Sequence, residues 1–113
     1  MSKKERPLGF TYNSFKWTIN YIEKGNIDKE LFGETFIDDQ EIDIYTKKRS
    51  EIVIKNTLLH ELLHVLLEDL IQAVDTNKNL NDKEESLIRL VTPRLFCLLS
   101  ANPTLARYIF LGE

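Results

Sequence analysis

Hydrophobic and polar residues alternate from Phe15 to Tyr21 in the segment FKWTINYIE, and Ile22 is the one apolar residue on the polar side. Successive side chains of an extended chain point to opposite faces, so a period of two places every second residue on the same side. The residues on the apolar side are Phe15, Trp17, Ile19 and Tyr21. The pattern therefore predicts a β-strand whose aromatic and aliphatic side faces a core.

Turn-forming residues follow this strand, and a second extended region comes after them. Gly25, Asn26 and Gly33 favour a reversal of the chain. The segment ETFIDDQEIDIYT is typical of a hairpin in which ETFI and EIDIYT are the arms and DDQ is the tip. We expect a small antiparallel sheet, with EIDIYT as an edge strand that would bind an extended peptide.

The spacing of apolar residues changes from two to about four beyond the hairpin. From Glu51 to about Ala73, apolar residues arrive as adjacent pairs separated by one helical turn. The pairs are Leu58 and Leu59, Leu62 and Leu63, Leu66 and Leu67, and Leu70 and Ile71. This pattern predicts a helix that is apolar around most of its circumference, and such a helix is expected to be buried.

A polar break, DTNKNLNDKE, separates this helix from a second one. Asn81 or Asp82 is a suitable N-cap for a helix that continues through LIRLVTPRLFCLLSA. Pro93 lacks a backbone donor, so we expect a kink or a break near Val91 and Thr92. The segment NPTLARYIF predicts a short terminal helix, with its asparagine at the cap and its proline at the first position.

The length of the chain limits how these elements can be arranged. A chain of 113 residues is long enough for one compact core, so we predict a single domain over residues 1–113, with a flexible arm at residues 1–9. The elements predict an α+β fold in which a small antiparallel β-sheet packs on the buried helix and the C-terminal helices. Cys97, in the apolar run LFCLLS, is expected to be a buried thiol.

Composition and charge narrow the classes of partner. Hydrophobic residues make up 42% of the chain and charged residues 29%, and the net charge is −3 with both signs interleaved. No basic face favours nucleic acid, and no cationic amphipathic helix favours a membrane. Because the chain has neither a secretory apolar run nor the roughly 20 apolar residues of a membrane span, we expect a cytoplasmic protein.

The only two histidines of the chain, His60 and His64, lie within the segment HELLH. Residues four apart on a helix share one face, with their Cβ atoms about 6 Å apart, so both imidazoles can reach one metal ion. Glu61 lies about 100° around the helix, where it can accept a proton from a water molecule bound to that ion. The H-E-x-x-H pattern therefore predicts Zn²⁺ held by both histidines, with Glu61 as the general base.

The two histidines could also be core residues of a leucine-rich helix that binds no metal. Burying one imidazole without a partner costs about 1–3 kcal/mol, and burying two on the same face roughly doubles that cost. A shared metal ion removes the cost, because it gives both rings a partner. This comparison favours the metal site over the core interpretation.

The third metal ligand must be a different residue type, because the chain has no further histidine. Glu84 and Glu85 are the candidates, in the first turn of the second helix. Glu84 lies on the apolar face of that helix, whereas Glu85 lies on a mixed stripe where Thr92 would permit close packing, and this favours Glu85. For either glutamate the alternative role is stabilisation of the helix dipole. We expect Arg89 to pair with Glu85 rather than to stabilise an oxyanion.

Three segments in order, GETFIDDQEIDIY, TLLHELLHVLL and EESLIRLVTPRLFCLLSANPTLARYIF, carry a family resemblance. From about residue 30 onward, the chain resembles the small H-E-x-x-H metallopeptidase-like proteins of bacteriophage and prophage genomes, which are related to the minimal gluzincins. The resemblance implies a zincin-like fold, zinc ligands at His60 and His64, a general base at Glu61 and a third ligand from a glutamate of the last segment. Some relatives have a glutamate one helical turn further along, where this chain has Arg89.

These observations predict a metallopeptidase-like protein that hydrolyses peptide bonds with a zinc-bound water activated by Glu61. Its partner would be a protein or peptide substrate, in the host cytoplasm if the chain is phage-encoded. The alternative is a non-catalytic, phage-encoded interaction protein that retains the zincin fold, with or without structural zinc, and binds a host protein. A third possibility is a metal-free helical regulator.

Overall fold

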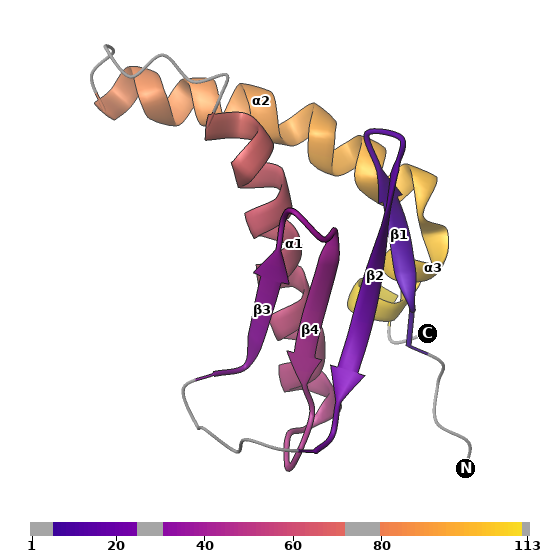
Figure 1. The fold of residues 1–113 in the computed structure, drawn as a ribbon. Helices are drawn as coiled ribbons and strands as arrows, with labels where there is room; N and C mark the ends of the chain where they lie inside the picture. Colours follow the sequence, from indigo (N-terminus) through magenta and orange to yellow (C-terminus); the bar gives the residue numbers. More distant parts are fainter. Residues whose placement is uncertain (1–5, 25–30, 72–79, 112–113) are drawn as a thin grey trace.

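The computed structural model describes residues 6–24, 31–71 and 80–111, apart from the side chains of residues 69–71 and 80–84 (Figure 1). Four strands form one sheet in the order β1, β2, β4, β3, and the predicted α+β class is confirmed. The strands are β1 (Gly9–Tyr12), β2 (Phe15–Ile22), β3 (Gly33–Phe36) and β4 (Glu41–Tyr45). The helices are α1 (Glu51–Ile71), α2 (Leu80–Ala101), α3 (Pro103–Ala106) and the π-helical η1 (Arg107–Leu111). None of the described helices is long and apolar enough to cross a membrane.

The sheet is mixed, because its two central strands run in the same direction. β1 and β2 form one antiparallel hairpin, and β3 and β4 form the predicted second one. β2 and β4 pair in parallel, from Thr18 opposite Glu41 to Ile22 opposite Tyr45. After β2 the chain enters the sheet again at the far edge as β3, and β4 then takes the position beside β2. The prediction of a purely antiparallel sheet is therefore wrong, because local patterns specify hairpins but not this long-range pairing.

The segment predicted to be the edge strand lies in the interior of the sheet. β4 pairs with β2 on one side and with β3 on the other. Its residues Ile42 and Ile44 are 0% exposed. The prediction that EIDIYT forms an edge is therefore wrong, and the edge strand beside α1 is β3 (Figure 1).

The first strand begins within the arm predicted at residues 1–9. Gly9 is the first residue of β1, which pairs along its full length with β2. Just before it, the Leu8 carbonyl accepts a hydrogen bond of 2.9 Å from the Ile19 amide. Arg6 donates hydrogen bonds to Glu51, and the Pro7 carbonyl accepts one of 2.7 Å from Tyr21, so these residues are also held in place. The rest of that prediction falls on residues 1–5, which lie outside the described part of the chain.

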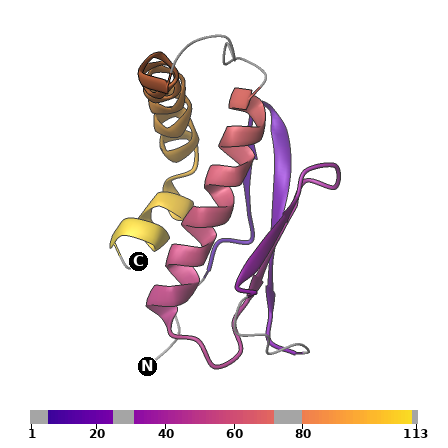
Figure 2. The same ribbon diagram turned by 90° about the vertical axis from the view of Figure 1, so that its left-hand side faces the viewer.

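α1 and the C-terminal helices lie on the same side of the sheet (Figures 1 and 2). On the opposite side, no helix among the described residues covers the sheet (Figure 2). The face of α1 that points toward the sheet supplies much of the core. The buried apolar residues of this face are Ile54, Leu58, Leu62, Val65 and Leu66. Leu63 and Leu67 are 38% and 39% exposed, so α1 is buried along one face rather than around its circumference.

α2 runs without interruption through Pro93, so the predicted break near Val91 and Thr92 does not occur. Proline removes one hydrogen bond from a helix, and the ladder on either side of it keeps α2 continuous. Cys97 on this helix is exposed, contrary to the prediction of a buried thiol. The reason is that Leu98 is the one α2 residue, among those described, that belongs to the buried core.

Asn102 links the C-terminal helices to the first strand. Its side-chain oxygen accepts a hydrogen bond of 3.0 Å from the Thr11 amide, and its side-chain nitrogen donates one of 3.0 Å to the Thr11 carbonyl. The same nitrogen also donates to the Leu98 carbonyl at 2.8 Å. Pro103 is the first residue of α3, as predicted, but Asn102 makes no side-chain capping bond to that helix.

Glu51, the first residue of α1, joins three distant parts of the chain. Arg6 donates two hydrogen bonds to its carboxylate, at 2.9 and 3.0 Å. The hydroxyl of Tyr108 in η1 donates another, and Tyr108 is 0% exposed. The hydrogen bonds from Arg6, and then that from Tyr108, lower the pKa of Glu51 to about 2. This network therefore holds the described N-terminal residues and the C-terminal turn against the start of α1.

We expect this network to make the free energy of unfolding sensitive to acid. A carboxyl group with a lowered folded-state pKa stabilises the fold above its unfolded value, which is 4.5 here, and loses that contribution as the pH falls toward 2. Because the Glu51 side chain is 45% exposed, solvent screening limits the contribution to about 0.5–1 kcal/mol. Urea unfolding between about pH 6 and pH 2.5 should show a shallower loss of stability in Glu51→Gln than in the wild type.

The matched control for this experiment is Glu23→Gln, because Glu23 is an exposed glutamate just beyond β2. This variant should keep the wild-type dependence of stability on pH. Identical slopes in Glu51→Gln and the wild type would show that the network contributes nothing to acid sensitivity.

Candidate metal centre

The two histidines of α1 converge at their outer nitrogens. His60 and His64 lie one helical turn apart, and their Nε2 atoms are 3.2 Å apart. The ring planes are inclined by 76°, with centroids 4.9 Å apart. The spacing of four residues therefore brings both imidazoles to one point, as the sequence pattern predicts.

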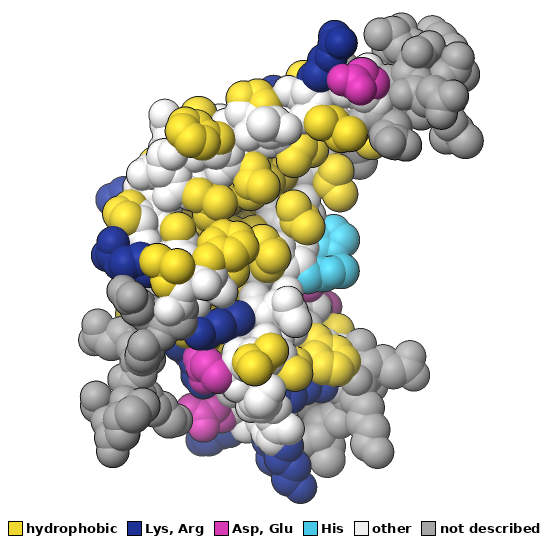
Figure 3. Space-filling model, turned by 180° about the vertical axis from the view of Figure 1, so that it is seen from behind, with side chains coloured by type: hydrophobic (Ala, Val, Ile, Leu, Met, Phe, Trp, Pro, Cys, Tyr) yellow, Lys and Arg dark blue, Asp and Glu magenta, His cyan; other side chains and the backbone are white. Residues whose placement is uncertain are grey.

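Both histidines are exposed, whereas the comparison of burial costs made from the sequence treated them as buried. Figure 3 shows them at the molecular surface, at the margin of a broad area of hydrophobic side chains. The cost of burying two imidazoles therefore does not apply, and it gives no support to a metal ion. The case for a metal has to come from the geometry of the ligand atoms.

Glu61 is the buried member of the group, with an exposed fraction of 5%. The hydroxyl of Thr35 on β3 donates a hydrogen bond of 2.6 Å to Oε1 of its carboxylate. A buried carboxylate needs such a partner, because its charge is otherwise costly to remove from water. Thr35 therefore fixes the Glu61 carboxylate from the neighbouring strand.

The close approach of β3 to α1 depends on Gly33. A Cβ atom at this position would lie 2.9 Å from Cγ2 of Thr57 and 3.2 Å from Cγ of Glu61. It would also lie 3.0 Å from the carbonyl oxygen of Asp43. Because all three of these distances are shorter than ordinary van der Waals contacts, a side chain here would push the strand away from the helix.

The positions of the three side chains fit a zinc ion. Two nitrogen ligands of tetrahedral Zn²⁺, each about 2.0–2.1 Å from the ion, lie about 3.3 Å apart. The Nε2 atoms of His60 and His64 are 3.2 Å apart, and the ligand atoms of the two histidines and Glu61 lie within 4.8 Å of one another. A hydrogen bond between the two rings would give a similar distance without a metal.

Of the two predicted third ligands, Glu85 does not join this group. The Glu85 carboxylate is bound by Nε of Arg89 at 3.1 Å, and both side chains are largely exposed. The predicted ion pair between these residues is therefore confirmed. Glu85 is not among the residues that the structure brings to the histidines. The side chain of Glu84 lies outside the described residues.

Two other glutamates line a hollow of about 420 Å³ that contains both histidines, which we call the histidine hollow. Glu68 lies one turn beyond His64 on α1, so the spacing of four that identified the histidines could also have identified it. Glu34 comes from β3, and no local pattern connects it to the helix. Its Oε1 accepts a hydrogen bond of 2.9 Å from Tyr45, which raises the pKa of the tyrosine to about 12.

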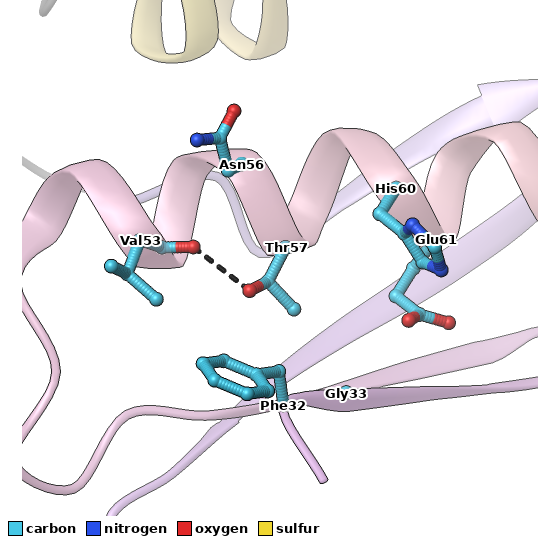
Figure 4. Close-up of a pocket in the computed structure, with 7 residues that line it drawn as sticks. All are labelled: Phe32, Gly33, Val53, Asn56, Thr57, His60 and Glu61. Carbon is cyan, nitrogen blue, oxygen red and sulfur yellow. Dashed lines mark hydrogen bonds between the residues drawn. The ribbon is translucent and has the colours of Figure 1, made fainter. Parts of the chain in front are cut away.

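A second hollow of about 450 Å³ adjoins the first on its N-terminal side along α1, and we call it the Phe32 hollow. Figure 4 shows the Phe32 ring beneath Thr57, and the Glu61 carboxylate directed from α1 toward the strand. The Thr57 hydroxyl donates to the Val53 carbonyl at 2.8 Å, and its methyl group lies against Gly33. His60 and Glu61 line both hollows, so the candidate centre lies between them.

Comparisons with known proteins were made at three levels. No protein-family model, no curated protein and no solved structure matched this chain. The resemblance to small H-E-x-x-H metallopeptidase-like proteins therefore stays a prediction, and function has to be argued from the geometry of the site.

The Thr35–Glu61 hydrogen bond can be tested by replacing Thr35 with valine, which removes the hydroxyl at nearly constant volume. The buried carboxylate then loses a partner, so the free energy of unfolding in urea should fall by about 1–3 kcal/mol. Thr18→Val, the same change at an exposed position of β2, should alter it by less than about 0.5 kcal/mol. Equal stability of the two variants would mean that the hydrogen bond does not stabilise the centre.

Proposed function

We propose that the chain is a zinc-dependent metallopeptidase in which His60 and His64 hold Zn²⁺ and Glu61 is the general base. The observation that carries this proposal is the 3.2 Å separation of the two Nε2 atoms beside a buried carboxylate. A pair of surface histidines without a chemical role gives no reason for the adjacent carboxylate to be buried and held by a hydroxyl group. A general base does require that its carboxylate be held in one orientation.

The chemistry divides between the metal and the side chains of the protein. Zn²⁺, when bound, would supply the positive charge that lowers the pKa of a water molecule to about 7 and polarises the scissile carbonyl. Glu61 would accept a proton from water at Oε2, because the Thr35 hydroxyl occupies Oε1. The same carboxylate would then donate the proton to the leaving amine. Thr35 would keep it in one orientation through both transfers.

The peptide substrate would lie along β3. This strand pairs with β4 on one side only, so the backbone groups of its other side are available to an extended peptide. Gly33, Glu34 and Thr35 of β3 line the histidine hollow. In this proposal, β3 takes the place of the β4 edge predicted from sequence.

The competing proposal is a non-catalytic interaction protein, with or without a structural metal. One observation favours it: among the described residues, all three members of the metal-binding group come from α1. A catalytic centre of the kind that the resemblance implies would take its third ligand from a different helix. Metal analysis and substitution of Glu61 distinguish the two proposals.

Protein purified without a histidine tag should contain about one zinc ion per chain, measured by elemental mass spectrometry. His60→Ala and His64→Ala should each lose this zinc. Glu61→Gln should retain the zinc and the fold, because it keeps the shape of the side chain. Its rate of peptide hydrolysis should fall by about 10²–10⁴-fold, which is the usual contribution of a general base.

Two results would contradict parts of this proposal. A wild-type chain without stoichiometric zinc would exclude both metal-dependent functions. A Glu61→Gln variant that hydrolyses peptides at the wild-type rate would exclude the catalytic role and favour the interaction protein.

The third ligand can be identified from zinc affinities, measured by competition with a chelator. We expect Glu84→Gln to weaken zinc binding by at least about tenfold, because a charged ligand would be lost. Glu85→Gln should have a smaller effect, because Glu85 pairs with Arg89 outside the histidine group. Glu68→Gln, which changes one of the two other glutamates that line the histidine hollow, should stay within about threefold of the wild type. The largest loss in Glu68→Gln would instead place the third ligand on α1 itself.

A further inference from the structure

A third hollow, of about 280 Å³, lies between α1 and the ends of the two hairpins. The turn between β1 and β2 and the turn between β3 and β4 are at the same end of the sheet (Figure 1). We call this cavity the Phe15 hollow. Its apolar lining residues are Tyr12, Phe15, Trp17, Ile37 and Val65.

The Phe15 hollow is continuous with the candidate metal centre. Ile37 and Glu68 line both this hollow and the histidine hollow. The histidine hollow in turn shares Gly33, His60 and Glu61 with the Phe32 hollow. The three hollows therefore follow one another along α1. β3 lines the first two, and the Phe15 hollow lies beyond the end of β3, where Ile37 follows the strand.

The lining of the Phe15 hollow favours an apolar occupant. Trp17 and Val65 are buried at its base, with exposed fractions of 7% and 4%. Phe15 and Ile37 at its rim are 58% and 36% exposed. The apolar period of β2 predicts that Phe15 faces the core, but in the structure its ring is open to solvent beside this hollow. An apolar side chain bound there would remove these surfaces from water.

The distance between the two hollows corresponds to a short stretch of extended peptide. On α1, the midpoint of Val65 and Glu68 lies four to five positions beyond the midpoint of His60 and His64, which is about 7 Å along a helix that rises 1.5 Å per residue. A strand rises about 3.3 Å per residue, so the hollows are about two residues apart. Side chains two residues apart in a strand point to the same face.

The charge of the intervening surface adds a second requirement. Glu34, Glu61 and Glu68 line the histidine hollow, and no lysine or arginine is among its lining residues. An acidic side chain of a bound peptide would be repelled by these carboxylates, whereas a basic or neutral one would not.

We propose that the Phe15 hollow is a substrate subsite of the metallopeptidase. It binds a large apolar side chain, such as leucine or phenylalanine, about two residues from the peptide bond at the histidines, and the intervening residue is not acidic. The proposal rests on the proposed hydrolysis of peptides along β3, and it adds the class of peptide that this edge selects.

The test uses unstructured ten-residue peptides of glycine, serine and lysine that contain a single leucine. Wild-type protein loaded with zinc should cleave them at a bond about two residues from the leucine, as mapped by mass spectrometry. Replacing the leucine with alanine should lower kcat/KM by about tenfold or more. Replacing the intervening lysine with glutamate should lower it further.

Two variants remove the rim of the hollow, and a third is the control. In Phe15→Ser and in Ile37→Ser, the ratio of kcat/KM between the leucine and alanine peptides should fall to near one. Phe96→Ser changes a phenylalanine on α2 that is 71% exposed and is not among the residues that line this hollow, and it should keep the wild-type ratio. Because Phe15 and Ile37 are exposed, neither substitution should change the fold, and circular dichroism measures this.

Binding measurements separate this proposal from the proposed function. If the wild type hydrolyses no peptide, fluorescence titration of labelled peptides with Glu61→Gln still reports the leucine preference. A preference that Phe15→Ser abolishes supports the subsite even when hydrolysis is absent. A leucine preference that persists in both rim variants, or no preference in the wild type, overturns the subsite and leaves hydrolysis untouched.

Discussion

The approach of β3 to α1 at Gly33 is the constraint on which the candidate site depends. Because this residue has no Cβ, the strand can lie against the helical turn that carries Thr57 and Glu61. That approach brings the Thr35 hydroxyl within 2.6 Å of the Glu61 carboxylate. It also forms the wall shared by the two hollows on either side of His60. The chemistry of the HELLH segment is therefore a property of the helix and the strand together.

The core residues and the candidate site residues of α1 lie on different faces of the helix. One face supplies core residues such as Leu58 and Leu62, which are 0% exposed. The adjacent face carries the exposed histidines, and Glu61 lies at the border between the two. Substitution of a histidine therefore removes little packing, whereas substitution of a core leucine would create a cavity that costs about 2–5 kcal/mol.

The features that sequence alone predicted are those specified by local periods. The alternation through β2, the β3–β4 hairpin and the four-residue spacing on α1 each depend on neighbours along the chain. The parallel pairing of β2 with β4 depends on where a distant strand enters the sheet, and no local period records it. The exposure of His60 and the contact of Thr35 with Glu61 likewise depend on how separate elements pack. The pattern could therefore identify the two histidines and Glu61, but not Thr35, whose hydroxyl orients the Glu61 carboxylate.

The two edges of the sheet differ, because Asn102 forms hydrogen bonds with Thr11 at the β1 edge. An edge strand presents unpaired backbone groups that can pair with another chain. At β1, the amide group of Asn102 occupies the Thr11 N–H and carbonyl as the peptide group of a neighbouring strand would. This contact joins residues 91 positions apart, so the protection of β1 is completed only when the C-terminal helices have packed. The backbone groups of Thr11 are thereby unavailable for strand addition at β1, and in the proposed function the extended peptide pairs with β3.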